Sequence, residues 1–161
     1  MKSRILFRLV SGVGTLSLIA ACAPEAPPVD VAAEQASIRD RLDQGFQAVQ
    51  NQDWETLSGL ISDDWVIFTH LGAKWNLDEM QEFFGAHIAD HRITISDMSI
   101  RVSGDERLAW ARFDEETQYT FDGNPIQEKA VFTAVFEKTD AEWKMVHLHR
   151  SAQPPPSEEQ L

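Results

Sequence analysis

The chain has 161 residues, a length typical of one domain, with 14 basic and 26 acidic residues and a formal net charge of −12 at pH 7. A protein this acidic is not expected to bind nucleic acid or anionic lipid headgroups through its surface charge. With a single cysteine it has no intramolecular disulfide, so its core must be stable without one.

The first 21 residues resemble a secretion signal. Basic residues at positions 2, 4 and 8 precede an apolar run over residues 9–21, which is too short to span a bilayer comfortably. The sequence IAAC at residues 19–22 resembles a bacterial lipobox, in which the cysteine is lipidated. We therefore expect residues 1–21 to be a signal peptide and Cys22 to be the lipidated first residue of the mature protein. The alternative is an ordinary secretion signal with an incidental cysteine.

The mature protein, residues 22–161, holds 11 of the 14 basic residues and all 26 acidic ones, a formal net charge of −15. We expect the lipid to be its sole membrane contact. Because alanine follows Cys22, the expected location is the outer membrane of a Gram-negative envelope, facing the periplasm. Proline-rich residues 22–31 are expected to be a tether, residues 32–152 the folded domain and residues 153–161 a disordered tail.

Three helices are predicted in the first half of this domain. Apolar residues at helical spacing predict an amphipathic helix over about 32–51, and Asp53 is expected to cap a second, short helix. Asn76 followed three residues later by Glu79 is a capping box, which opens a third helix.

The remainder has the composition of strands. The run WVIFTH at 65–70 predicts a strand that returns through a hairpin around Gly72, and from residue 92 onward the chain alternates as a strand, with a phase slip at Ser96-Asp97 that indicates a bulge. Three further strands are expected at 107–121, 126–138 and 143–151. Helices followed by a meander of long strands predict an α+β domain with the helices on one face of a curved antiparallel sheet.

Two strand motifs resemble a known family. TQYTFDGNP at 117–125 and EWKMVHLHRS at 142–151 are similar to the cone-shaped nuclear transport factor 2-like superfamily, to its SnoaL-like branch and most of all to the association (hub) domain of calcium/calmodulin-dependent protein kinase II. The resemblance covers about 33–151 and implies three helices on a strongly curved sheet. It fixes fold better than function, because the superfamily includes isomerases, dehydratases, transport adaptors and oligomerisation hubs.

The resemblance also implies a difference in the pocket. Hub domains carry arginines inside the cone, and Glu115 and Ala134 stand where two of them would be. A pocket for an acidic ligand is therefore not expected.

The last predicted strand raises the question of a metal site. Strict alternation places Trp143, Met145, His147, His149 and Ser151 on one face. Two histidines can chelate a metal, but a site needs a third and usually a fourth ligand, and the other histidines form no ligand motif. His87 and His91 are instead expected at helical spacing near the end of the third helix. We expect no metal and no cofactor, and histidines that pack on the sheet or line a pocket.

Enzymes of this superfamily use a carboxylate, sometimes with His or Tyr, to move a proton in an apolar cavity. The resemblance and the alternation together make Glu115, Tyr119 and His149 the candidate catalytic residues. The alternative for Glu115 is a solvated position, because it lies in a run of three acids. The expected ligand-binding residues, each of which could instead belong to the core, are Trp65, Phe68, His70, Trp75, Phe113 and Phe132.

The expected function is the binding of a small, largely apolar molecule in a cone-shaped pocket. Two alternatives stay open: an acid-base enzyme of the isomerase or dehydratase type, and an oligomerisation module whose cone is filled by its own side chains. A homodimer is expected, because the strand at 126–138 is apolar on both faces and needs a second cover.

Overall fold

The computed structural model describes residues 30–69 and 72–152. The predicted signal peptide, Cys22, residues 22–29 of the tether, His70 and the tail at 153–161 lie outside the described residues. The elements are α1 (Val31–Asn51), α2 (Trp54–Leu60), β1 (Ile61–Phe68), β2 (Lys74–Trp75), α3 (Leu77–His87), β3 (Ile88–Val102), β4 (Leu108–Phe121), β5 (Asn124–Thr139) and β6 (Glu142–Ala152). Of the helices in these ranges, none has the length and apolar character needed to cross a membrane.

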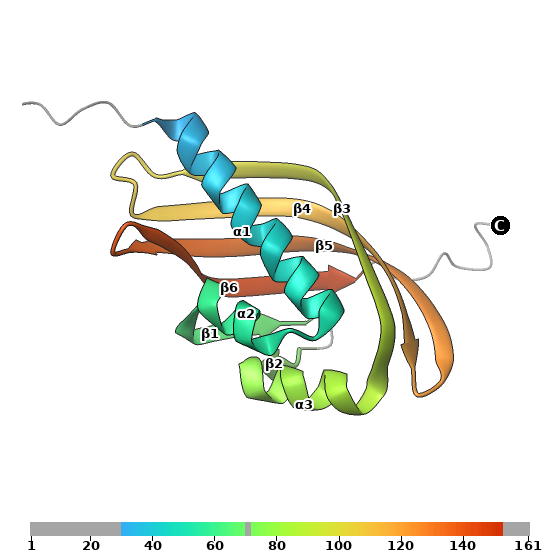
Figure 1. Ribbon diagram of the computed structural model, residues 1–161. Helices are drawn as coiled ribbons and strands as arrows, with labels where there is room; N and C mark the ends of the chain where they lie inside the picture. Colours follow the sequence, from blue (N-terminus) through green and yellow to red (C-terminus); the bar gives the residue numbers. More distant parts are fainter. Residues whose placement is uncertain (1–29, 70–71, 153–161) are drawn as a thin grey trace, which may run out of the picture.

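The six strands form one sheet in the order β2-β1-β6-β5-β4-β3, in which all neighbours are antiparallel except β1 and β6. Helix α1 crosses one face of the curved sheet, α2 lies beside β1, and α3 lies at the end toward which β3, β4 and β5 bend (Figure 1). The predicted α+β architecture, with three helices on a curved sheet, is confirmed.

The predicted helix starts are also confirmed. The Asp53 carboxylate accepts a hydrogen bond from the Thr56 amide at 3.1 Å. At the start of α3 the Asn76 side chain accepts from the Glu79 amide, and the Glu79 carboxylate accepts from the Asn76 amide, both at 2.9 Å. Each start satisfies backbone donors that the helix itself leaves unpaired.

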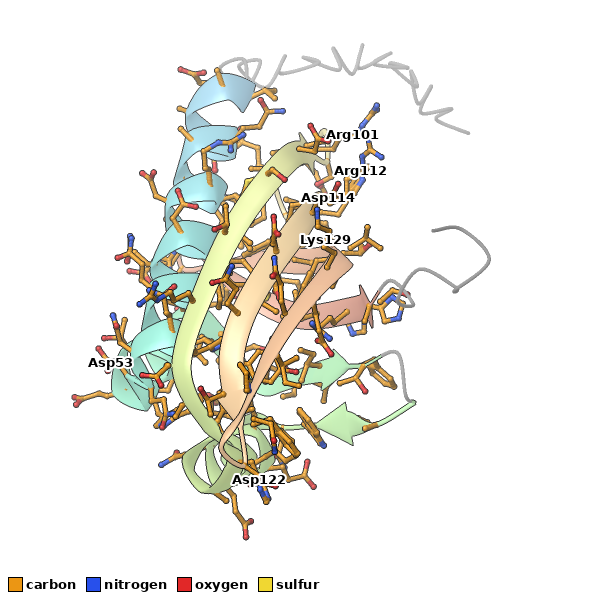
Figure 2. All side chains as sticks on the ribbon, turned by 90° about the vertical axis from the view of Figure 1, so that its right-hand side faces the viewer. Asp53, Arg101, Arg112, Asp114, Asp122 and Lys129 are labelled. Carbon is orange, nitrogen blue, oxygen red and sulfur yellow. The ribbon has the colours of Figure 1, made fainter. Side chains whose placement is uncertain are left out.

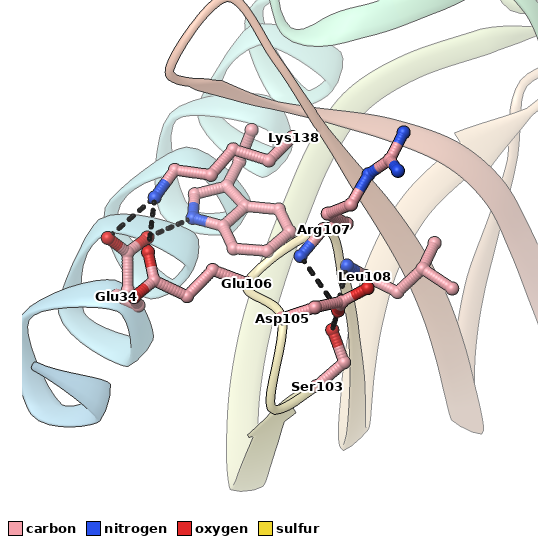
Figure 3. A network of polar contacts seen from close by, with 8 residues as sticks. Glu34, Ser103, Asp105, Glu106, Arg107, Leu108 and Lys138 are labelled. Atoms are coloured by element: carbon pink, nitrogen blue, oxygen red, sulfur yellow. Dashed lines mark hydrogen bonds and ion pairs between the residues drawn. The ribbon is translucent and has the colours of Figure 1, made fainter. Parts of the chain in front are cut away.

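A polar network connects the first turn of α1 to the end of β5 and the start of β6 (Figure 3). The Trp143 indole N–H donates to the Glu34 carboxylate at 2.6 Å, and the Lys138 ammonium donates to the same carboxylate at 2.7 Å. These bonds, that from Lys138 first, hold the pKa of Glu34 below its ordinary value. Helix α1 is thereby fixed across the sheet, and Phe46 on its second half packs its ring edge against Phe113 at 5.3 Å between centroids.

Strand β3 contains two irregularities. The predicted slip at Ser96-Asp97 is confirmed by a register shift between Ser96 and Ser99, where Asp97 has φ of 50°. A second shift between Ala89 and Arg92 was not predicted, and there Asp90 has φ of 52°.

The prediction that His91 lies near the end of the third helix is wrong, because His91 belongs to β3 and lies within this second irregularity. The helix ends at His87 because the backbone of Ile88 is extended, with φ of −109° and ψ of 128°, and pairs with Phe121 on β4.

Strand β6 contains a bulge that reverses its alternation. Met145 lies opposite Phe136 and His147 lies opposite Val135, so Val146 is an extra residue. Trp143 and Met145 are buried before the bulge, and Leu148 is buried after it. The prediction that His147 and His149 share the face of Trp143 is therefore wrong, because one inserted residue moves every later side chain to the other face.

The face of the sheet opposite α1 combines charged and apolar side chains. Figure 2 shows Arg101, Arg112, Asp114 and Lys129 on this side of the molecule. Among them the Trp110 side chain is 46% exposed and Val131 is 43% exposed.

Candidate functional site

A cavity of about 380 Å³ is lined by residues of the second half of α1, of helix α3 and of the strands. Most of its lining is apolar, and the apolar side chains come from every layer of the fold: Phe46, Val49, Ile67, Ala73, Trp75, Met80, Phe83, Phe84, Ile88, Ile93, Phe132 and Leu148. The polar lining residues are Thr69, His91, Glu115, Thr117, Tyr119, Glu128 and Arg150. A largely apolar cavity with a few convergent polar groups is the usual form of a small-molecule site.

Glu115 is the central titratable group of the cavity. It lies on the inner face of β4 and only 6% of it is exposed. Burial raises the pKa of the Glu115 carboxyl to about 7, the nearby Arg150 guanidinium opposes this rise and the Glu128 carboxylate adds to it. A carboxyl with this pKa can both accept and release a proton near neutral pH.

Arg150 lies between two carboxylates. Its guanidinium donates to Glu128 at 2.7 Å, and the same nitrogen is 3.7 Å from the Glu115 carboxylate, too far for a hydrogen bond. The guanidinium also lies over the Phe132 ring, 6.0 Å from its centroid. Arg150 is therefore bonded to Glu128, while Glu115 receives only its electrostatic attraction.

His91 is held in one neutral form by Thr117. The Thr117 hydroxyl donates to the Arg92 carbonyl at 3.1 Å, so its oxygen accepts from the Nε2–H of His91 at 3.0 Å. Burial first, and the charge of Arg150 second, lower the pKa of His91 to about 4. The other ring nitrogen, Nδ1, is buried without a hydrogen-bond partner among the described residues.

Four of the predicted site residues line the cavity: Glu115, Tyr119, Trp75 and Phe132. Tyr119 lies four residues after Glu115 on the same face of β4, and burial first, then the Glu128 charge, raises the pKa of its hydroxyl. Tyr119 therefore stays protonated at neutral pH and can donate a hydrogen bond to a ligand.

The other predicted residues do not line the cavity. His149 is exposed on the opposite face of β6 because of the bulge, and Phe68 is 37% exposed and packs against His147. Trp65 and Phe113 are buried in the core, where the Phe113 ring stacks on Phe132 at 5.1 Å between centroids. These four positions are corrections to the expected pocket.

His91, Glu128 and Arg150 are cavity residues that the sequence analysis did not identify. Glu128 could have been found, because it alternates with Ala130 and Phe132 on the inner face of β5. His91 and Arg150 each follow a bulge, so no regular alternation predicts their direction. In the described parts of the chain, no three or more His, Cys, Asp or Glu side chains gather as a metal site would require.

Comparison with known proteins identifies the fold. The sequence model of the SnoaL-like domain matches residues 38–155. A nuclear transport factor 2-like protein from Cytophaga hutchinsonii is similar in structure with a TM-score of 0.66 and 21% identity, over 74% of this chain and 98% of its own. No curated protein matches the sequence at a significant level.

Two further structures belong to proteins of different proposed roles. A proposed calcium/calmodulin-dependent kinase II association domain from Exiguobacterium sibiricum gives a TM-score of 0.70 at 12% identity, over 80% of this chain and 99% of its own. A proposed dehydratase of the nuclear transport factor 2-like family from Streptomyces avermitilis gives 0.64 at 17% identity, over 77% and 99%. The resemblance expected from the strand motifs is confirmed for the fold.

The two buried groups predict opposite effects of pH on stability. The pKa of Glu115 is raised from 4.5 to about 7 on folding, so its contribution to the free energy of unfolding is present below pH 4.5 and is lost as the pH rises to about 7. The pKa of His91 is lowered from 6.5 to about 4, so its contribution increases with pH over that interval. Between pH 4.5 and 6.5 the two effects oppose each other.

Glu115→Gln separates these effects. Relative to the unsubstituted protein, we expect the variant's free energy of unfolding to increase by roughly 3 kcal/mol from about pH 4 to pH 8. Urea denaturation at a series of pH values measures this difference. Glu116→Gln, the same chemical change on the outward face of β4, is the matched control. A pH-independent difference for Glu115→Gln would contradict the raised pKa.

Proposed function

The chain belongs to the SnoaL-like domain family, and we propose that its cavity binds a small, largely apolar molecule and exchanges a proton with it through Glu115. The observation that carries this proposal is the carboxyl of Glu115, 6% exposed in an apolar cavity, with its pKa raised to about 7. A carboxyl group that acts as a general acid or base works best when its pKa lies near the working pH, and burial in an apolar cavity raises the pKa to that range.

The proposed chemistry is proton transfer of the isomerase or dehydratase type. The Glu115 carboxylate takes a proton from a carbon next to a carbonyl group of the ligand. The C–H electron pair forms a carbon–carbon double bond, and the carbonyl π pair moves to the oxygen. Tyr119, protonated at neutral pH, donates a hydrogen bond to that oxyanion. Return of the proton to another carbon completes an isomerisation. The proposed dehydratase from Streptomyces avermitilis, which has the same fold, supports this reaction class.

Binding without turnover is the second candidate, because the same cavity serves both. The cavity of about 380 Å³ argues against the remaining alternative, a module whose cone is filled by its own side chains. His149, exposed on the other face of the sheet, has no part in the proposed chemistry.

The proposal predicts a retained ligand and a catalysed exchange. Native mass spectrometry of the purified protein should show a bound small molecule, and incubation in D₂O should introduce deuterium into it. Loss of a positioned base slows such a step by ~10²–10⁴-fold, so Glu115→Gln should retain the molecule but lose the exchange, whereas Glu116→Gln should keep both. If Glu115→Gln exchanged the proton as fast as the unsubstituted protein, binding without turnover would be the remaining function. An empty cavity after extraction from the native membrane would overturn both functions.

We also propose that the domain is anchored to the outer membrane by a lipid on Cys22. The support is the sequence pattern alone: basic residues, the apolar run at 9–21 and the sequence IAAC at 19–22. Because the thiol carries the lipid, Cys22→Ser should leave the precursor unprocessed or release the domain from the membrane fraction. Fractionation and gel mobility measure this, and an unchanged pattern would exclude the lipoprotein.

A homodimer through the outer sheet face is proposed from the exposed Trp110, Leu108 and Val131, which are 46%, 46% and 43% exposed. Kinship in fold with an association domain agrees with this arrangement. Sedimentation velocity at micromolar concentration should give a dimer, and Trp110→Glu should give a folded monomer, because a buried unpaired charge opposes association. A monomer before any substitution would refute the dimer.

A further inference from the structure

Three charged side chains lie together at the cavity wall, and Arg150 is closer to Glu128 than to Glu115. Arg150 has a hydrogen bond to Glu128 at 2.7 Å and an ion pair with Glu115 at 3.7 Å. The Arg150 side chain is 16% exposed, Glu128 is 31% exposed and Glu115 is 5% exposed, so the cation stays largely away from solvent. The more exposed carboxylate therefore has the closer contact, and the deeper one lacks a hydrogen bond from Arg150.

This arrangement keeps Arg150, the one cation among the described residues that line the cavity, from binding a ligand anion. A guanidinium facing an apolar cavity would ordinarily attract a carboxylate or phosphate, because it binds such groups through two parallel hydrogen bonds. Here one of its nitrogens is already bonded to Glu128, and a ligand anion that approached it would also face Glu115. With Glu115 ionised the three groups carry a net charge of −1, and with Glu115 protonated they are neutral.

The other polar groups of the lining add no positive charge. His91 is neutral near pH 7, because burial first, then the charge of Arg150, lowers its pKa to about 4. Tyr119 and Thr117 are uncharged hydroxyls. No other lysine or arginine is among the residues that line the cavity in the described part of the chain.

We propose that Glu128 is a specificity-determining residue: by binding Arg150 it makes the cavity accept an uncharged ligand and reject an anionic one. It also acts as a positioning residue for the proton-transfer step, because it holds the guanidinium away from Glu115. This inference rests on the proposed function for the existence of a ligand and names the class of that ligand.

The test uses two probes of nearly equal shape, the neutral 2-naphthamide and the anionic 2-naphthoate. At pH 8, calorimetry on the whole protein should show 2-naphthamide binding on the order of tenfold or more tighter than 2-naphthoate. In Glu128→Gln the three groups lose one negative charge and are neutral at pH 8, so they repel the probe carboxylate less and the ratio should change by at least tenfold in favour of 2-naphthoate. Glu116→Gln, outside the cavity, should keep the original ratio.

A second measurement needs no ligand. Carbon-13 NMR of the Glu115 carboxyl should show its pKa fall in Glu128→Gln, because Arg150 then pairs with Glu115. In an Arg150→Met background the same Glu128→Gln change should lower the pKa much less, and this difference separates an effect through Arg150 from the loss of a nearby negative charge. Circular dichroism verifies that each variant is folded.

The outcomes separate this inference from the proposed function. An unchanged probe ratio in Glu128→Gln, a preference of the unsubstituted protein for 2-naphthoate, or an equal pKa change in both backgrounds would overturn the role of Glu128 while leaving ligand binding intact. Failure of both probes to bind would count against the proposed cavity function, and the Glu115 titration would then decide the role of Glu128 by itself.

Discussion

The inserted residue at Val146 is the constraint on which the cavity depends. Before it, β6 directs Trp143 and Met145 into the core, and after it the strand directs Leu148 and Arg150 inward. Without the bulge the two histidines would face the cavity, and Arg150, the only cation among the described lining residues, would face away. A single extra residue in one strand thus decides whether the cavity holds an imidazole pair or an arginine.

The positive charge of Arg150 partly offsets the energetic cost of burying the Glu115 carboxylate. A lone carboxylate in an apolar cavity would be strongly destabilising, and a fully paired one would lose its proton well below neutral pH. The 3.7 Å separation between these two side chains lies between those limits, because Glu128 has the shorter contact with the guanidinium. The pKa of about 7 is the sum of a large effect of burial and a smaller opposing attraction.

The similar structures share the fold of this chain, and the fold alone does not determine the side chains of the site. Structures 12% to 21% identical to the chain establish the fold, and one fold carries both an association domain and a dehydratase among the proposed roles of these relatives. In this chain the inner face of β4 carries Glu115, and Arg150 on β6 is bonded to Glu128. The function of the chain therefore follows from its own side chains.

The sequence by itself determined the architecture and one face of the site. Caps at Asp53 and Asn76, the helical spacing of α1 and the regular alternation of β4 and β5 are local signals, and they placed Glu115, Tyr119 and Phe132 on the inner face correctly. Only the tertiary structure decided the directions of His91 and Arg150, because each follows a bulge whose extra residue is defined by pairing with a neighbouring strand. The hydrogen bond from Arg150 to Glu128 joins residues on two strands, and the pKa of Glu115 is raised chiefly by burial under several elements. No local sequence pattern predicts either.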